Sequence, residues 1–396
     1  MQNTVFKEKE QSPFTPGIPV PPDLFVGREE ELSLITRSMK EVLNGKQKNI
    51  FITGERGIGK SSLAAYSREI AEKNYNFLCA YVSLGGVTQL EEMTRRIFES
   101  FVRESHGKSF FEKIKTFLKD YIREVNAMGL ITFRFEPDKR DLDGITRNFP
   151  QALSNLLKTA GNKGMLIVLD DINGLSDNPN FAHFLKSFVD GIAISRTTLP
   201  LLLMLSGIPE RRYAMMKHQE SVGRIFDVVE ISRLHGPEIE KFYKKTFEKV
   251  GITIDRDALT SIIDYSSGLP TLLHEIGDAV LRVDSDNHID KNDAVVGIFK
   301  ATEIVGNKYL NRQIMDAIKS KKYKKILEKA SEKFVFTKTD LDKGLSGEEK
   351  KVLDNFFNRM KKIGVLKSTE QRGEYEFVNW FIYAYIWMIT RKVRTT

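Results

Sequence analysis

The stretch Asn49-Ile-Phe-Ile-Thr-Gly-Glu-Arg-Gly-Ile-Gly-Lys-Ser-Ser62 decides the fold of this chain. Its first apolar residues, 50–53, predict a buried strand, and the residues that follow match the phosphate-binding pattern Gly-x-x-x-x-Gly-Lys-Ser. Glycines let successive backbone N–H groups turn toward an anion, and the helix behind the loop points its positive end at the same charge. We therefore expect a nucleoside triphosphate to bind this loop. The expected cofactor-binding residues are Gly54, Glu55, Arg56, Gly57, Ile58, Gly59, Lys60, Ser61 and Ser62.

A triphosphate also needs a cation and acidic groups around it. Lys60 is expected to reach the β- and γ-phosphates, and the Ser61 hydroxyl to ligate Mg²⁺. Asp170 and Asp171 follow the apolar run 164–169, which predicts a strand ending in two carboxylates. We expect Asp170 to coordinate Mg²⁺, directly or through water, and Asp171 to orient the attacking water as a general base. The alternative is that the two acids only end the strand and cap the next segment.

The composition is that of a water-soluble globular protein, and 396 residues are too many for a single core. One cysteine, Cys79, excludes an intrachain disulfide and a thiolate metal site, and it fits a reducing cytoplasmic location. No secretory signal is evident, and the apolar tract 377–389 is too short to cross a bilayer. We expect no membrane contact, with a membrane-surface helix as the minor alternative. Residues 308–396 hold 21 Lys and Arg against 11 Asp and Glu, so the positive charge is concentrated there.

Four segments are predicted along the chain. Residues 1–22 are Pro-rich and predict an extended lead-in on the surface. Residues 23–234 alternate strands (50–53, 77–83, 164–171, 199–206 and 226–231) with helices, including one at 108–127. This alternation predicts an α/β fold, the parallel sheet of a P-loop NTPase with helices on both faces. Residues 235–306 predict an all-α lid. Residues 307–396 predict helices followed by a β-hairpin, the pattern of a winged helix.

Phe25-Val-Gly-Arg-Glu-Glu-Glu31, placed ahead of the phosphate loop, resembles the motif that opens many AAA+ and STAND-type ATPases. The order of motifs is similar to that of archaeal ATPases and of origin-recognition initiators. Gly268-Leu-Pro270 resembles the GxP motif of STAND proteins. The resemblance implies that the nucleotide is ATP or ADP, and that Phe25, Val26 and Gly27 line the adenine pocket together with Pro270. It also implies that Arg28 contacts the nucleotide or braces that pocket; the alternative is a helix-start arginine that pairs with Glu31.

The resemblance implies three further roles. Ser206, at the end of the predicted strand 199–206, would sense the γ-phosphate; alternatively it is an ordinary serine at a strand end. Arg224 is the best-placed arginine to act on a neighbouring copy in a homo-oligomer, with Arg211 and Arg212 as runners-up. The helix after Pro270 lacks the second sensor arginine of typical AAA+ enzymes, which favours the STAND-like branch. His274 in that helix would face the nucleotide or be a hydrogen-bonded core histidine.

The basic C-terminal segment offers a second working surface. A helix predicted at 347–363 carries polar and basic residues beside an apolar stripe, and in a DNA-binding winged helix it would enter the major groove. The alternative is that the winged helix binds protein or holds the nucleotide domain shut. The expected DNA-contacting residues are Lys351, Asn355, Arg359, Lys362 and, on the hairpin, Arg372.

We therefore expect an ATPase that works as a slowly hydrolysing molecular switch, whose nucleotide state controls the winged helix and its access to a partner or to a second copy. The alternative function is a DNA-binding ATPase of the initiator or transposition-regulator type. A third and weaker hypothesis is an inert nucleotide-binding scaffold.

Overall fold

The computed structural model describes residues 11–103, 142–194 and 199–392; the helix predicted at 108–127 lies outside these residues. The chain divides into two compact units between Val20 and Pro21 and again between Ser232 and Arg233. Residues 21–232 form the first unit. The second unit contains residues 233–392 together with the N-terminal residues up to 20.

The first unit is built on a five-stranded sheet whose strands are all parallel, in the order β2-β3-β4-β1-β5. Every residue of β3 is buried, as expected for a strand that is covered on both faces. Because β4 lies between β1 and β3, the phosphate loop and the aspartates follow strands that are not neighbours. The predicted parallel sheet is confirmed. Its strands are β1 (Lys48–Thr53), β2 (Phe77–Ser83), β3 (Gly164–Asp170), β4 (Leu201–Gly207) and β5 (Asp227–Glu230).

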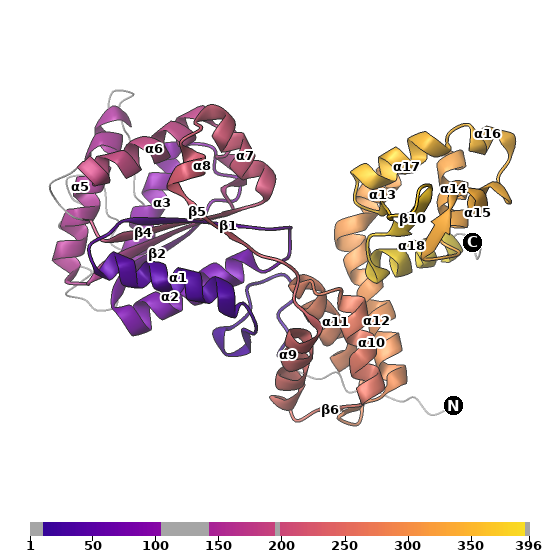
Figure 1. The fold of residues 1–396 in the computed structure, drawn as a ribbon. Coiled ribbons are helices and arrows are strands. Elements are labelled where there is room, and N and C mark those ends of the chain that lie inside the picture. The colour runs from indigo at the N-terminus through magenta and orange to yellow at the C-terminus, as the bar shows by residue number, and fades with distance from the viewer. Residues whose placement is uncertain (1–10, 104–141, 195–198, 393–396) are drawn as a thin grey trace, which may run out of the picture. The chain divides into compact units, whose positions relative to one another are not determined.

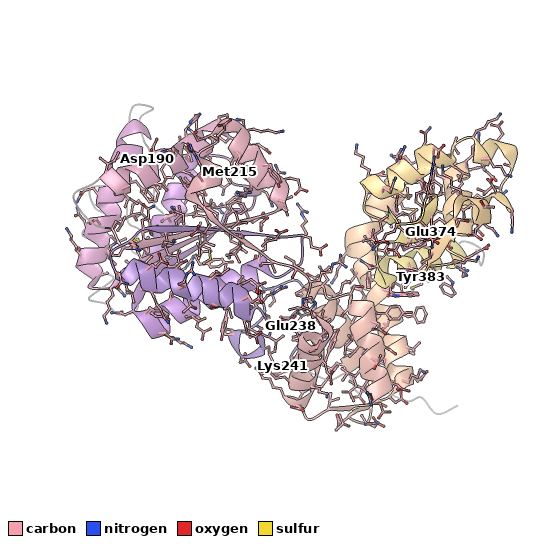
Figure 2. All side chains as sticks on the ribbon, viewed as in Figure 1. Asp190, Met215, Glu238, Lys241, Glu374 and Tyr383 are labelled. Carbon is pink, nitrogen blue, oxygen red and sulfur yellow. The ribbon has the colours of Figure 1, made fainter. Side chains whose placement is uncertain are left out.

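Helices cover both faces of this sheet (Figure 1). Two short 3₁₀ turns, η1 (Pro22–Leu24) and η2 (Ile172–Gly174), complete the unit. On one face of the sheet the buried side chains form a single core (Figure 2), in which Met215 is fully buried. One face carries α1 (Glu29–Leu43) and α2 (Lys60–Tyr75); the other carries α3 (Leu90–Arg103), α5 (Leu142–Ala160), α6 (Pro179–Ile194), α7 (Pro209–His218) and α8 (Val222–Ile225).

The second unit begins with four helices, as predicted for residues 235–306. A short parallel pair, β6 (Thr253–Ile254) with β7 (His288–Ile289), ties the loop after the first helix to the loop before the last. The sequence pattern did not predict this pair, because two-residue strands leave no periodicity. The helices are α9 (Gly236–Glu248), α10 (Arg256–Ser266), α11 (Pro270–Val283) and α12 (Lys291–Val305).

The N-terminal segment enters this helical part through Phe14. The Phe14 side chain is only 4 % exposed, and its ring centroid lies 5.2 Å from that of Phe247 and 6.0 Å from that of Phe242. A Cβ atom on Gly277 would come within 2.2 Å of the Phe14 ring, so the ring rests on the bare backbone of α11. Phe14 is therefore buried, whereas the Pro-rich segment was expected to lie on the surface.

The C-terminal part of the second unit combines helices with a three-stranded antiparallel sheet in the order β8-β10-β9. The hairpin of β9 and β10 was predicted; β8 was not. The single helix predicted at 347–363 is wrong, because the N–H of Val352 bonds to the carbonyl of Glu349, and this tighter turn divides it. The elements are η3 (Gly306–Leu310), α13 (Asn311–Ala317), α14 (Lys321–Ala330), β8 (Val335–Thr337), α15 (Lys338–Asp342), α16 (Gly347–Lys350), α17 (Leu353–Lys362), β9 (Leu366–Ser368), β10 (Glu374–Phe377) and α18 (Trp380–Lys392).

Candidate functional site

The phosphate loop connects β1 to α2 and depends on glycine at three positions. Gly54, Gly57 and Gly59 have φ values of 153°, 77° and 99°, which side-chain-bearing residues rarely adopt. A Cβ on Gly54 would also lie 2.8 Å from the carbonyl oxygen of Ile231, so the loop passes close to the chain after β5. Gly59 stands at the N-cap of α2, and Lys60 and Ser61 open the helix. The loop is therefore curled over a helix N-terminus, as its sequence predicts.

Lys60 folds back over this loop. Its Nζ donates to the carbonyl oxygens of Gly54 and Glu55, each at 2.8 Å. Burial lowers the pKa of Lys60 below the ordinary lysine value of 10.5, while the charges of Asp170 and Asp171 act in the opposite direction. The ammonium group is thus partly withdrawn from water, and the charges of both aspartates act on it. A polyanion bound at the loop would favour its charged form.

Asp170 ends β3 and is 6 % exposed. Both of its carboxylate oxygens accept hydrogen bonds: Oδ2 from the hydroxyl of Tyr81, at 2.6 Å, and Oδ1 from the hydroxyl of Ser206. The two donors come from the strands on either side of β3, since Tyr81 belongs to β2 and Ser206 to β4. The strand order therefore explains why these side chains meet.

Tyr81 was not predicted as a site residue. Its hydroxyl also lies 3.4 Å from the carbonyl oxygen of Ser61, so it spans the two residues expected to hold Mg²⁺. Burial and then the negative charge of Asp170 raise the pKa of Tyr81 well above its ordinary value, so the phenol stays protonated and acts as a donor. The only signal in the sequence is a phenol within the otherwise apolar run 77–82.

Asp171 leaves the strand with a left-handed backbone, φ 57° and ψ 61°, and forms the N-cap of η2. Its side chain accepts from the amide of Asn173, and its backbone N–H donates to the Ser206 hydroxyl at 3.3 Å. Ser206 is therefore bonded to both aspartates. The predicted roles of Asp171 as a base and of Ser206 as a γ-phosphate sensor stay predictions.

The residues from Phe25 to Glu31 lie against the loop and its helix. The Phe25 ring stacks on Tyr66 of α2, with centroids 4.6 Å apart. Arg28 has a left-handed φ of 68°, is 7 % exposed, and donates to the carbonyl of Ile58 within the loop at 3.2 Å. It also pairs with Glu31 at 3.3 Å. Arg28 thus braces the phosphate loop and pairs with Glu31, as the alternative interpretation expected. Its contact with the nucleotide or with the adenine pocket stays a prediction.

Between Arg28 and Phe25, Val26 and Gly27 are partly buried, and Gly27 has a φ of 67°. Their place in an adenine pocket stays a prediction. Pro270, the fourth residue assigned to that pocket, belongs to the second unit, where it opens α11.

The motif Gly268-Leu-Pro270 contacts Leu234, near the first residues of the second unit after β5. The carbonyl of Gly268 accepts from the N–H of Leu234 at 2.9 Å, and a Cβ on Gly268 would lie 2.4 Å from the Leu234 carbonyl oxygen. His274, one turn further on, is 6 % exposed and its Nδ1 accepts from the N–H of Thr15 at 3.0 Å. His274 is therefore a hydrogen-bonded core histidine, which is the second of the two interpretations given for it above.

The arginines proposed to act on a neighbouring copy lie after β4. Arg224 is exposed on α8 and donates to the hydroxyl of Ser221 at 3.3 Å. Arg211 pairs with Asp177, and Arg212 donates to the carbonyl of Gly223 at 3.4 Å. Both runners-up are half-buried. The exposed Arg224 remains the best-placed candidate.

The predicted DNA-contacting residues are all exposed. Lys351, however, precedes α17 and pairs with Glu348 at 2.7 Å, while Arg359 donates to the carbonyl of Asp316 at 2.8 Å. The Glu348 carboxylate therefore offsets part of the positive charge at Lys351. Asn355 and Lys362 lie on α17, and Arg372 lies between β9 and β10.

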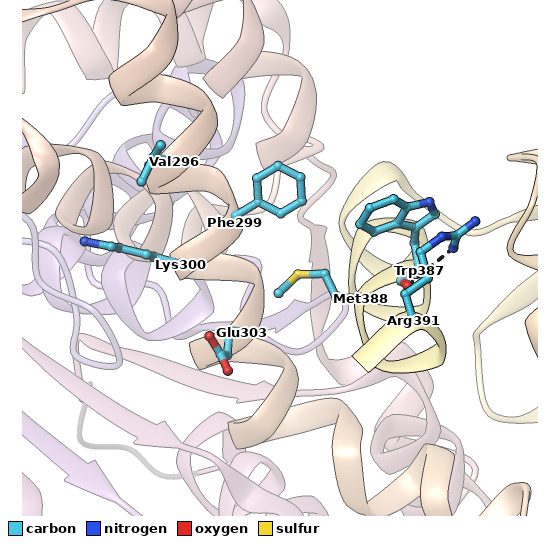
Figure 3. Close-up of a pocket in the computed structure, with 7 residues that line it drawn as sticks. All are labelled: Val296, Phe299, Lys300, Glu303, Trp387, Met388 and Arg391. Atoms are coloured by element: carbon cyan, nitrogen blue, oxygen red, sulfur yellow. Dashed lines mark hydrogen bonds between the residues drawn. The ribbon is translucent and has the colours of Figure 1, made fainter. Parts of the chain in front are cut away.

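A separate groove of about 510 Å³ opens between α12 and α18. Phe299 and Trp387 lie across it from one another, with ring centroids 6.4 Å apart (Figure 3). The guanidinium of Arg391 lies 4.3 Å from the centre of the Trp387 ring. Its remaining lining residues are Val296, Lys300, Glu303 and Met388. None of the predicted nucleotide-binding residues lines this groove.

Two other kinds of feature are absent from the described ranges. No helix there is both long enough and apolar enough to cross a membrane. The same residues contain no cluster of three or more His, Cys, Asp or Glu side chains that could hold a metal ion by themselves.

Comparisons with known proteins concern the fold and the family of this chain. No curated protein sequence matches the chain significantly. Among solved structures, the Walker-type ATPase of Pyrococcus abyssi has a TM-score of 0.54 at 16 % identity, over 92 % of this chain and 96 % of that one. The ORC2 protein of Aeropyrum pernix, solved as ADPNP–ADP complexes, has a TM-score of 0.57 at 13 % identity, over 99 % of this chain and all of that one. At these identities the likeness shows a shared fold.

Residues 24–213 match the family model described as AAA ATPase domain. This range contains the phosphate loop, the Arg28 brace and the Tyr81–Asp170–Ser206 network. The part of the chain that carries the nucleotide-site geometry is therefore similar to an AAA ATPase domain.

Proposed function

We propose that the first unit binds ATP and ADP with Mg²⁺ at the phosphate loop and hydrolyses ATP slowly, as a molecular switch. The observation that carries the proposal is the partly buried Lys60 ammonium. It is held over the loop by two carbonyl oxygens, and the charge of the buried Asp170 acts on it. A cation in this position, at a helix N-terminus, is arranged for a phosphate chain.

The donor set fits Mg²⁺ because it consists of hard oxygen groups. Ser61 and Asp170 would hold the ion together with phosphate oxygens, as Mg²⁺ sites of this kind use one or two protein ligands. When bound, the ion would neutralise charge on the phosphates. Asp171 would orient the attacking water, Ser206 would contact the γ-phosphate, and Arg28 would keep the loop in place through Ile58.

The test of this site is nucleotide binding and turnover in the wild type and in Lys60→Ala. Charge-assisted hydrogen bonds are worth about 1.5–3 kcal/mol, so we expect ATP affinity to fall by about 10- to 100-fold. Lys73→Ala is the matched control, because Lys73 is an exposed lysine of the same helix that pairs with Glu69. ATP affinity that is equal in the wild type and in Lys60→Ala would refute the proposed site.

The switch function is supported by the division of the chain into two units, the second of which holds the Gly268–Pro270 motif and the basic C-terminal part. We expect ATP and ADP to give different hydrogen-exchange protection in residues 233–392. Identical protection in the two nucleotide states, at concentrations that saturate the site, would contradict a switch.

Homo-oligomer formation is part of the same proposal, with Arg224 acting on the ATP of a neighbouring copy. A mixture of inactive Arg224→Ala and inactive Lys60→Ala chains would then recover ATPase activity, since mixed neighbours contain one intact site. No recovery from the mixture would exclude Arg224 from this role.

The alternative function, a DNA-binding ATPase, is supported by the exposure of the five basic and polar residues on and beside α17, with the C-terminal part proposed to be a winged helix. It predicts salt-dependent duplex binding that is abolished when Lys351, Arg359 and Lys362 are replaced by alanine together. The salt slope should fall by about 0.9 for each DNA phosphate that the variant no longer neutralises. The matched control replaces three exposed lysines of α9, Lys241, Lys244 and Lys245. Absence of duplex binding at low salt would eliminate this alternative.

A further inference from the structure

One phenol links the two residues that the proposed function assigns to Mg²⁺. The Tyr81 hydroxyl donates to Oδ2 of Asp170 at 2.6 Å and lies 3.4 Å from the backbone carbonyl of Ser61. The other carboxylate oxygen of Asp170 accepts from Ser206. The orientation of the Asp170 carboxylate is thus set by one donor on each side. Of these two donors, Tyr81 is the one that also lies close to Ser61 at the start of α2.

Tyr81 is itself held firmly. It lies on β2, the edge strand of the sheet among the described residues, so no strand in that part of the chain pairs with its outward backbone groups. The hydroxyl of Ser100, which is fully buried on α3, bonds to these groups instead of a strand. It accepts from the Tyr81 N–H at 3.0 Å and donates to the Tyr81 carbonyl at 3.1 Å. On the inner side the next residue, Val82, is in register with Leu169, directly before Asp170. The phenol is therefore placed by backbone contacts on both edges of its strand.

We propose that Tyr81 is a positioning residue for Mg²⁺-dependent nucleotide binding, which fixes the orientation of Asp170 and its separation from Ser61. The inference rests on the proposed function of the site. Mg²⁺ demands nearly ideal octahedral geometry, so a carboxylate that is free to rotate binds it less well than one that is held. Hydrogen bonds to metal ligands of this kind are typically worth 10- to 100-fold in metal affinity.

The test is Tyr81→Phe, which keeps the ring and the Ser100 clamp and removes only the hydroxyl. ATP affinity is measured for the intact protein in excess Mg²⁺ and again in EDTA. We expect the affinity in Mg²⁺ to fall by about 10-fold or more, and the affinity in EDTA to stay within twofold of the wild type. The matched control is Tyr243→Phe, which removes a buried phenol that donates to the Leu273 carbonyl at 3.1 Å in the second unit. That control should leave both affinities unchanged.

The outcomes separate the two proposals. If the wild type binds ATP in Mg²⁺ and Tyr81→Phe binds it equally well, the positioning role is overturned and the proposed function stands. If Tyr81→Phe loses equal affinity in Mg²⁺ and in EDTA, Tyr81 supports the loop as a whole and the positioning role is again overturned. If the wild type binds no ATP under either condition, the proposed function itself fails.

Discussion

Replacing Phe14 by alanine tests whether the Pro-rich segment is part of the second unit. The Phe14 side chain is 4 % exposed, packs against Phe242 and Phe247, and rests on the backbone of Gly277. Its removal leaves a cavity bounded by helices α9 and α11, which cannot close without moving them. Buried Phe→Ala substitutions cost about 3–5 kcal/mol, so we expect a loss of at least about 3 kcal/mol.

The chain offers a clean probe for this measurement. Its two tryptophans, Trp380 and Trp387, both belong to the unit that contains Phe14, so tryptophan fluorescence in urea follows the unfolding of that unit. With a slope of about 2 kcal/mol per molar urea, a loss of about 3 kcal/mol lowers the midpoint by about 1.5 M. Ile18→Ala is the matched control, since Ile18 in the same segment is 65 % exposed and should shift the midpoint little. Equal midpoints for Phe14→Ala and Ile18→Ala would refute the packing described above.

Three further predictions concern individual residues. Burial lowers the pKa of His274 to about 4, whereas unfolded histidine titrates near 6.5, so the unfolded chain takes up the proton first as pH falls. The free energy of unfolding measured by urea titration should therefore drop by about 2 kcal/mol between pH 7 and pH 5, and a free energy that stays constant over this range would contradict the argument. Gly268→Ala should destabilise the second unit by at least about 2 kcal/mol because its φ is 72° and its Cβ would meet the Leu234 carbonyl, whereas Gly236→Ala, with open space around it, should not. Burial lowers the pKa of Lys60, so its ammonium group loses its proton below the ordinary lysine value of 10.5, and the neutral form attracts phosphate less strongly. ATP affinity should therefore weaken as the pH rises toward 10.5, and an affinity that stays constant up to that pH would disprove the argument.

Much of the fold follows from local patterns in the sequence. In the parallel sheet, β2 occurs at the residues predicted, and β1, β3, β4 and β5 differ from the predicted ranges by one or two residues at their ends. Continuous apolar runs bounded by Gly or polar residues mark buried parallel strands well, because both faces exclude water. The loop was equally predictable, since each of its glycines serves a backbone angle that other residues rarely adopt.

The parts that were missed depend on contacts between residues distant in sequence. Phe14 is buried only because Gly277 leaves room for its ring, and nothing near residue 14 records this. The strand β8 exists because β10 pairs with it, while its own three residues carry no periodic signal. The division of the helix predicted at 347–363 is a difference of one hydrogen bond at Val352, which amphipathic spacing does not register.

The nucleotide site itself shows why strand order matters more than any one motif. The loop follows β1 and the aspartates follow β3, but β4 lies between these strands, so the two motifs cannot be joined by direct strand pairing. What orients Asp170 is one hydroxyl from each neighbouring strand, Tyr81 on β2 and Ser206 on β4. The Tyr81 hydroxyl also lies close to the Ser61 carbonyl at the start of α2, which brings the helix behind the loop into the same network. A motif search finds the loop and the acid separately, whereas their mutual geometry is a property of the assembled sheet.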